Sequence, residues 1–202
     1  MRDIVAGDYL LIMSKRFLVG ECAQLLLDDL NRQYALMGQI ERRARHLDIF
    51  LKCLHPRFLP LILSRLSRLF FLLNIPLVPF VFSYLNLVLF GLQITPRCCI
   101  GGGLFLPHPS GIVIGAWRIG RNVTIFQQVT LGAKEVDLNF TPSLLPEICD
   151  YVTVGAGAKV LGGIRLAENV IVGANAVVIK PVDKNLTVAG IPARVITSSS
   201  CL

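Results

Sequence analysis

Hydrophobic positions in the second half of the chain repeat with a period of six residues. The repeat runs from Ile94 to Val178, with one interruption between Leu131 and Ile148. Six residues match neither the 3.6-residue period of an amphipathic helix nor the two-residue alternation of a half-buried strand. The pattern indicates short strands separated by sharp turns and stacked into a solenoid, with the repeating residues pointing inward. These residues are Ile94, Ile100, Leu106, Ile112, Ile119, Ile125, Leu131, Ile148, Val154, Val160, Leu166, Val172 and Val178.

Small or aliphatic residues follow most of the repeating positions at a distance of four, where they would fill the corners of the coils. The interruption predicts a loop over residues 133–147 that leaves the solenoid and covers another part of the protein. Its apolar members include Val136, Leu138 and Phe140, and Lys134 is its only basic residue.

The first half of the chain shows helical spacing instead. Residues 1–57 form a predicted helical region in which Glu21 to Ile40 is one amphipathic helix. Residues 58–93 are a second segment, and no charged residue occurs from Leu69 to Pro96. Pro76 and Pro79 divide this apolar stretch into two predicted helices, each short for a membrane span. They are expected to lie on a membrane face, although packing on the solenoid or on another subunit is the alternative.

Composition narrows the choice of partners. The net charge is +7, hydrophobic residues make up 53% of the chain and charged residues 16%. A positive balance favours phosphorylated cofactors, nucleic acid or an anionic membrane surface. Because the chain lacks a basic stripe with interleaved aromatic residues, no nucleic acid partner is expected. Six cysteines show no metal-ligand spacing and no convincing signal peptide precedes them, so no metal site and a cytoplasmic location are expected.

One histidine stands apart from the repeat. The window from Leu106 to Gly115 reads LPHPSGIVIG, and its His108 is two positions past an inward residue and should point away from the coil. With the windows QQVTLG at 127–132, VGAGAKVLG at 154–162 and AGIPAR at 189–194, it resembles the serine acetyltransferase branch of the hexapeptide-repeat acyltransferases. Within that family the chain is most similar in character to the relatives that O-acetylate sugars for surface polysaccharides.

The resemblance covers about residues 92–197 and implies an α+β fold. A left-handed parallel β-helix at 94–197, with the loop 133–147, would follow the N-terminal helical region, and three chains would form a homotrimer. His108 would be the general base that takes the proton of the acceptor hydroxyl. Acetyl-CoA, as co-substrate, would lie between two subunits. Its expected contacts are Gly132, Ala133, Ala156 and Ala174, with Lys180 and Arg194 as phosphate partners, and those of the acceptor are Gln127, Asp137, Leu144 and Leu145.

The chain departs from serine acetyltransferases at positions that matter for the acceptor. Pro107 occupies the place of an acid before the histidine, Gln93 replaces an aspartate, and Leu144-Leu145 replace an arginine and a histidine. An amino-acid carboxylate would meet no charge partner at these positions, and leaving it unpaired is costly. The departures favour a saccharide or lipid-linked saccharide acceptor at the inner face of the cytoplasmic membrane. A serine O-acetyltransferase of cysteine biosynthesis and a non-catalytic trimeric scaffold are the alternatives.

Overall fold

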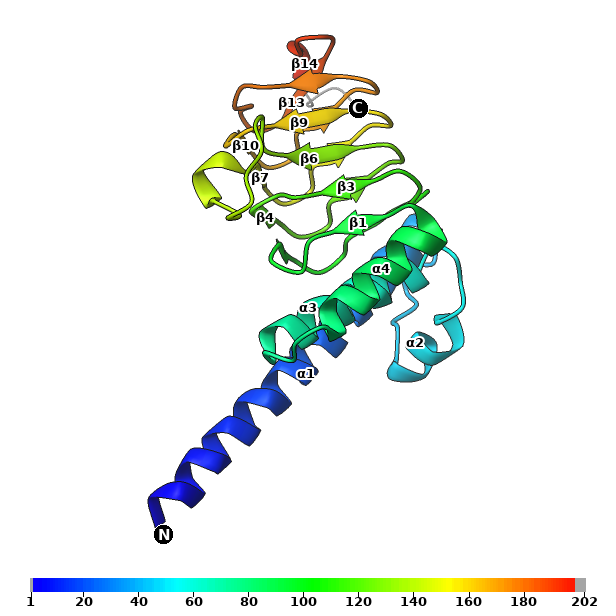
Figure 1. The fold of residues 1–202 in the computed structure, drawn as a ribbon. Helices are drawn as coiled ribbons and strands as arrows, with labels where there is room; N and C mark the ends of the chain where they lie inside the picture. The colour runs from blue at the N-terminus through cyan, green and yellow to red at the C-terminus, as the bar shows by residue number, and fades with distance from the viewer. Residues whose placement is uncertain (1, 199–202) are drawn as a thin grey trace.

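The computed structural model describes residues 2–198, and its first half is helical. Helix α1 (Arg2–Leu36) is followed by α2 (His46–Lys52), α3 (Leu59–Leu72) and α4 (Val78–Phe90). The predicted helix over Glu21 to Ile40 overlaps α1, which starts earlier and ends at Leu36, so the prediction ran four residues too far; Gly38 beyond the end has φ of 78°. The two predicted apolar helices are α3 and α4. Figure 1 shows these helices below the solenoid, with the N-terminal part of α1 extending away from it.

The second half is a solenoid of very short strands in three sheets. The first sheet contains β1, β3, β6, β9 and β12, the second β2, β4, β7 and β10, and the third β5, β8, β11, β13 and β14. All pairs are parallel except β13 with β14, an antiparallel pair that closes the C-terminal end. The strand bounds are β1 (Gln93–Ile94), β2 (Cys99–Ile100), β3 (Val113–Ile114), β4 (Arg118–Ile119), β5 (Thr124–Ile125), β6 (Thr130–Gly132), β7 (Glu147–Ile148), β8 (Thr153–Val154), β9 (Lys159–Leu161), β10 (Arg165–Leu166), β11 (Ile171–Val172), β12 (Val177–Val178), β13 (Leu186–Ala189) and β14 (Arg194–Ser198).

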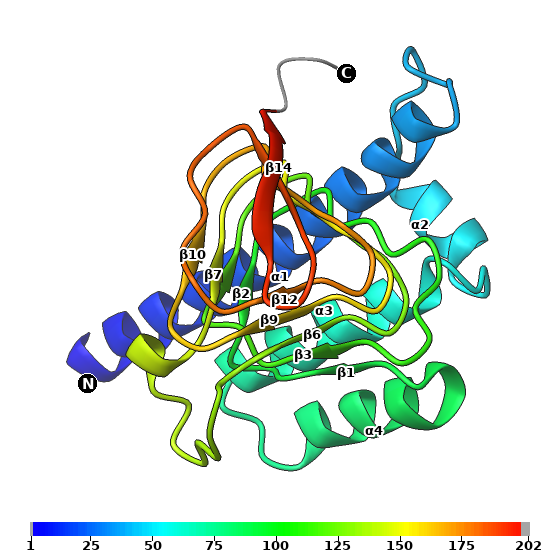
Figure 2. The ribbon, with the colours of Figure 1, turned by 90° about the horizontal axis from the view of Figure 1, so that it is seen from above.

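The six-residue repeat is confirmed as the core of this solenoid. Every repeating residue is buried except Ile100, which lies in the first coil and is partly covered by the helices. Corner residues such as Val129 and Ala158 are completely buried as well. Viewed along its axis in Figure 2, the solenoid is triangular, with one sheet on each side. The fold is therefore the predicted α+β arrangement of a helical region and a left-handed β-helix.

A buried ion pair joins the helices to the first coil. Arg65 of α3 donates from Nε and Nη2 to the carboxylate of Asp29 in α1, at 3.1 and 3.0 Å. Its Nη1 and Nη2 also donate to the carbonyls of Ile100 and Gly101, each at 2.6 Å, and the Leu104 amide donates to Asp29 at 2.8 Å. Both side chains are almost completely buried. Removing one partner of such a pair costs about 3–5 kcal/mol, because a charge is left buried without its partner.

Helix α4 carries the most exposed apolar surface of the helical region. It buries Pro79 and Asn86 against its neighbours and has no charged residue. Its exposed side chains are Phe80, Val81, Tyr84, Leu85, Leu87, Val88 and Leu89. Within residues 2–198 no helix is both long enough and apolar enough to cross a membrane.

Candidate functional site

His108 lies at one edge of the solenoid, where the chain turns from the third sheet to the first. Phe105 pairs with Thr124 of the third sheet, and β3 of the first sheet begins at Val113, so residues 107–112 form this turn. The next coils turn at the same edge through 126–129, 155–158 and 173–176. We call these four turns the histidine edge. His108, Gln127, Ala156 and Ala174 all lie along it.

A continuous ladder of backbone hydrogen bonds holds the histidine edge. The amides of Gln128, Gly157 and Asn175 donate to the carbonyls of Ser110, Gln127 and Ala156 in the coil before each, at 2.8 to 3.0 Å. The same position in every turn is left-handed, with φ of 69° at Gly111, 60° at Gln128, 71° at Gly157 and 57° at Asn175. Glycine is favoured at such positions, and a Cβ at Gly157 would overlap the Asn175 side chain. The ladder therefore gives the edge a fixed backbone.

The histidine edge presents two groups suited to acyl transfer. The imidazole of His108 is exposed beside a shallow depression whose other lining residues are Pro56, Leu89, Phe90, Gly91, Pro109 and Ser110. In the coil above, the side-chain Oε1 of Gln127 is buried without a hydrogen-bond partner among the described residues. A buried acceptor without a partner costs about 1–3 kcal/mol, so a ligand donor would be bound favourably there.

Most of the remaining predicted residues lie at a second edge, where the first sheet turns to the second; Arg194, in β14 of the third sheet, does not. We call its turns, at 115–117, 132–146, 162–164 and 179–181, the loop edge. Gly132 and Ala133 start the long loop, which projects from one corner of the triangle in Figure 2. A Cβ at Gly132 would meet nothing within 4 Å, so this position is open. Lys134 reaches along the same edge to the carbonyl of Ile179, at 3.5 Å.

The loop is fixed internally by Asp137. Its carboxylate accepts hydrogen bonds from the amides of Asn139 and Thr141 and from the Thr141 hydroxyl. These donors, foremost the Thr141 amide, hold the pKa of Asp137 below its usual value. The side chain thus serves the conformation of its own loop. Within one chain it lies on the loop edge, whereas His108 lies on the histidine edge.

Two residues that the sequence reasoning missed hold the loop against the solenoid. Arg97 donates from Nη1 to the Asn139 carbonyl at 3.2 Å, and Trp117 packs against Phe140 with ring centroids 6.2 Å apart. Neither residue belongs to a family motif or to the six-residue repeat. The only sequence signal was the single tryptophan of the chain at a coil corner.

Leu144 and Leu145 differ in exposure. Leu144, at the end of a 3₁₀ turn (Pro142–Leu144), is 49% exposed, whereas Leu145 is buried. A Cβ at Gly163 would overlap the Ser143 carbonyl, so the glycine allows the loop to lie directly on the next coil. Leu144 can face a ligand, and Leu145 mainly anchors the loop.

The two predicted phosphate partners come together at the C-terminal end of the solenoid. Lys180 and Arg194 line one depression there, together with Asp183 and the apolar side chains of Val178 and Ala193. Both cations are exposed, and the Arg194 Nη1 donates to the Ala193 carbonyl at 3.0 Å. Among the described residues no group of three or more His, Cys, Asp or Glu side chains could hold a metal ion.

Within one chain, the predicted site is divided between opposite ends of the first sheet. The histidine edge carries His108, Gln127, Ala156 and Ala174, and the loop edge carries Gly132, Ala133 and the loop. A triangular solenoid places one full sheet between two of its edges (Figure 2). Within one chain, the two groups of predicted residues therefore do not come together.

Part of the chain is similar in sequence to serine acetyltransferases. No family model matches the chain. A serine acetyltransferase of Synechococcus elongatus is 39% identical over 146 residues, which is 72% of this chain and 59% of the relative. One from Mycobacterium tuberculosis is 42% identical over 113 residues, 55% of this chain and 48% of the relative. The chain thus spans only about half to three-fifths of the length of these relatives.

Solved structures extend the likeness to the helices. The serine acetyltransferase of Neisseria gonorrhoeae aligns with a TM-score of 0.75 and 27% identity, over 89% of this chain and 68% of that chain. A serine acetyltransferase in complex with CoA aligns with a TM-score of 0.74 and 26% identity, over 92% and 74%. This chain has the fold of the hexapeptide-repeat acyltransferases.

The comparisons correct the expected acceptor. A saccharide or lipid-linked saccharide was predicted from Gln93, Pro107 and Leu144-Leu145, and polysaccharide O-acetyltransferases were taken as the most similar relatives. The similar curated proteins are serine acetyltransferases, at 39–46% identity. The saccharide prediction is therefore wrong, because it treated the absence of charged residues at a few motif positions as decisive for the whole site.

Proposed function

We propose that the protein is an acetyl-CoA-dependent O-acetyltransferase whose acceptor is the hydroxyl of L-serine. The observation that carries this proposal is the similarity to serine acetyltransferases over 72% of the chain, in a fold that leaves His108 exposed on the histidine edge. The CoA complex of a structural neighbour supports acetyl-CoA as the donor.

In the proposed reaction, His108 accepts the hydroxyl proton while the serine oxygen attacks the thioester carbonyl carbon. The tetrahedral intermediate then collapses, the carbon–sulfur bond breaks, and the imidazolium returns the proton to the departing thiolate of CoA. General base catalysis of this kind contributes roughly 10²–10⁴-fold to the rate. Backbone amides of a rigid coil corner suit the stabilisation of the oxyanion, since preorganised donors need no rearrangement.

The proposed cofactor site is a groove between two chains of a homotrimer. The histidine edge of one chain would face the loop edge of the next, so that Ala156 and Ala174 lie opposite Gly132 and Ala133. Their small side chains leave room for the pantetheine arm. Lys180 and Arg194 are the proposed partners of the CoA phosphates, because they line one depression. Gln127 would accept a hydrogen bond from the donor or the acceptor through its unpartnered Oε1.

The serine carboxylate requires a cation that the loop positions 144 and 145 do not provide. Arg97 lies against the loop, and only its Nη1 is engaged by a side-chain hydrogen bond among the described residues. We propose Arg97 as the carboxylate partner, with Leu144 covering the acceptor. Arg97→Gln should then raise the KM for serine at nearly unchanged kcat, whereas Arg57→Gln, on an exposed residue of the helical region, should change neither.

We also propose where the protein acts in the cell. The protein would act in the cytoplasm, with the exposed face of α4 resting on the inner face of the membrane. Its support is the uncharged surface of Phe80, Val88 and their neighbours. Phe80→Glu with Val88→Glu should then shift the protein from membrane to supernatant fractions, and unchanged fractionation would refute the contact.

The proposed activity is tested with purified protein, acetyl-CoA and L-serine. Free CoA thiol should appear with serine, and mass spectrometry should detect O-acetylserine. His108→Ala should reduce turnover by about a hundredfold or more with unchanged folding, while the exposed His46→Ala serves as the matched control. No serine-dependent release of thiol, or full activity of His108→Ala, would contradict the proposal.

A further inference from the structure

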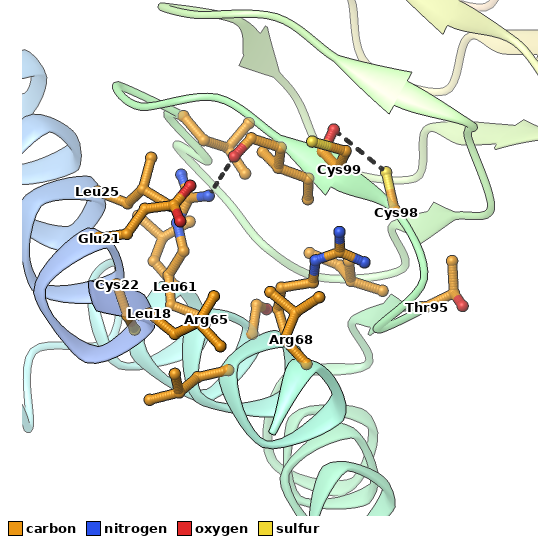
Figure 3. A pocket seen from close by; sticks show the side chains of 16 residues that line it. Leu18, Glu21, Cys22, Leu25, Leu61, Arg65, Arg68, Thr95, Cys98 and Cys99 are labelled. Carbon is orange, nitrogen blue, oxygen red and sulfur yellow. Dashed lines mark hydrogen bonds between the residues drawn. The ribbon is translucent and has the colours of Figure 1, made fainter. Parts of the chain in front are cut away.

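An apolar cavity of about 90 Å³ lies where the helices meet the first coil of the solenoid, away from the histidine edge. Helix α1 contributes Leu18, Cys22 and Leu25, and helix α3 contributes Leu61, Leu69 and Leu72. The turn between β1 and β2 contributes Thr95, Cys98 and Cys99, as Figure 3 shows. Glu21, Leu72 and Cys99 are exposed and mark the open side. None of its lining residues belongs to the depression beside His108.

The interior of the cavity is apolar in character, including its two buried cysteines. Burial raises the pKa of the Cys98 thiol to about 12, and burial likewise raises the pKa of Cys22. Both thiols are therefore protonated near neutral pH and behave as small hydrophobic groups. Engineered apolar cavities of roughly 150 Å³ stay dry and bind benzene. A smaller cavity with the same chemistry suits an aliphatic chain of about four carbons.

Two arginines line the cavity, but only one can serve a ligand. Arg65 is fully engaged by Asp29 and by the carbonyls of Ile100 and Gly101. Arg68 uses Nη1 for the carbonyls of Pro96 and Arg97, at 2.8 and 2.9 Å. Its Nε and Nη2 have no hydrogen-bond partner among the described residues. The two hydrogen bonds from Nη1 fix the Arg68 guanidinium at the cavity. Its Nε–H and Nη2–H groups remain available to bind a carboxylate.

We propose that this cavity binds a short aliphatic carboxylate, whose chain lies among the leucines and cysteines and whose carboxylate pairs with Arg68. The ligand would contact α1, α3 and the β1–β2 turn at once. It would therefore strengthen the attachment of the helices to the solenoid. The cavity shares no lining residue with the proposed acetyl-transfer site, although Arg68 also holds the carbonyl of Arg97.

Pentanoate is the direct probe, and its binding to the full chain is measured by calorimetry and by the shift in Tm. Acetate provides the carboxylate without the chain, pentanol the chain without the charge, and pentylamine the opposite charge. Pentanoate should bind best and raise Tm. Acetate or pentylamine binding as tightly as pentanoate would overturn the proposal, the latter because Glu21 would then be the anchor.

Three variants locate the site. Arg68→Gln should weaken pentanoate binding about tenfold or more and leave pentanol binding nearly unchanged. Cys22→Met places a longer, adaptable side chain in the cavity and should abolish binding of both. Arg57→Gln, outside the cavity, should leave both affinities unchanged. Circular dichroism checks that each variant is folded. A dissociation constant weaker than roughly 10 mM for pentanoate would refute the site. Equal binding of pentanoate by all variants would refute it as well.

Discussion

The solenoid and the helical region achieve stability in different ways. In the solenoid, each coil stacks an aliphatic residue on its copy in the next coil, and twelve of these residues from Ile94 to Val178 are buried. The helical region has no repeat and leaves much of α4 exposed. It is attached to the solenoid by buried apolar side chains such as Leu30 and Phe58. The bonds of Arg68 to the Pro96 and Arg97 carbonyls and the buried ion pair of Asp29 with Arg65 add polar contacts to the first coil. The solenoid is thus stabilised by many equivalent apolar contacts, whereas the junction combines apolar packing with a buried ion pair that has no equivalent in the coils.

The largest loss of stability is expected for a substitution where the helices meet the first coil of the solenoid. Asp29→Ala leaves the Arg65 guanidinium buried without its anion and should lower the free energy of unfolding by about 3–5 kcal/mol. Chemical denaturation followed by circular dichroism measures the loss. The control is Glu168→Ala, which removes an exposed pair with Arg165 and should cost about 1 kcal/mol or less. Equal losses in the two variants would show that the buried pair is not a special anchor.

A substitution in the core of the solenoid should lower the free energy of unfolding by a similar or smaller amount. Leu131 is completely buried, and Leu131→Ala should cost about 2–5 kcal/mol through the lost apolar contacts and the cavity left behind. Leu89→Ala on α4, where the side chain is 58% exposed, should change stability by about 0.5 kcal/mol or less. If Leu89→Ala were as costly as Leu131→Ala in the isolated protein, α4 would be covered by another copy of the chain.

A substitution that displaces the loop should lower the enzyme activity more than the stability of the protein. A methyl group at Gly163 overlaps the Ser143 carbonyl, so Gly163→Ala should push the loop from the coil while the stacked core remains intact. Serine turnover should fall, with coenzyme A binding and Tm changed little. Gly20→Ala is the control, because a Cβ there meets nothing within 4 Å. Normal serine turnover in Gly163→Ala would mean that the loop does not position the acceptor.

The sequence predicted the fold more fully than the site, and the reason is physical. A period of six fixes which side chains face inward, and Ile148 resumes the pattern after the loop, so the core followed directly. Periodicity does not tell which edge of the solenoid each predicted site residue belongs to, so the separation of His108 from Gly132, Ala133 and Asp137 within one chain had to come from the structure. The acceptor was predicted wrongly from Leu144-Leu145. A cation can reach a substrate from outside the motif, and Arg97 lies against the loop without any sequence signal.

The central claim is that the histidine edge of one chain works with the loop edge of another. Two inactive variants test it directly: His108→Ala, and a chain with residues 135–145 replaced by two glycines. After the two are mixed, unfolded and refolded together, mixed trimers should regain roughly a quarter of the serine acetyltransferase activity, since each contribution is intact in half of the chains. Each variant refolded alone should remain inactive. No recovered activity in mixtures shown by mass spectrometry to contain both chains would contradict the claim.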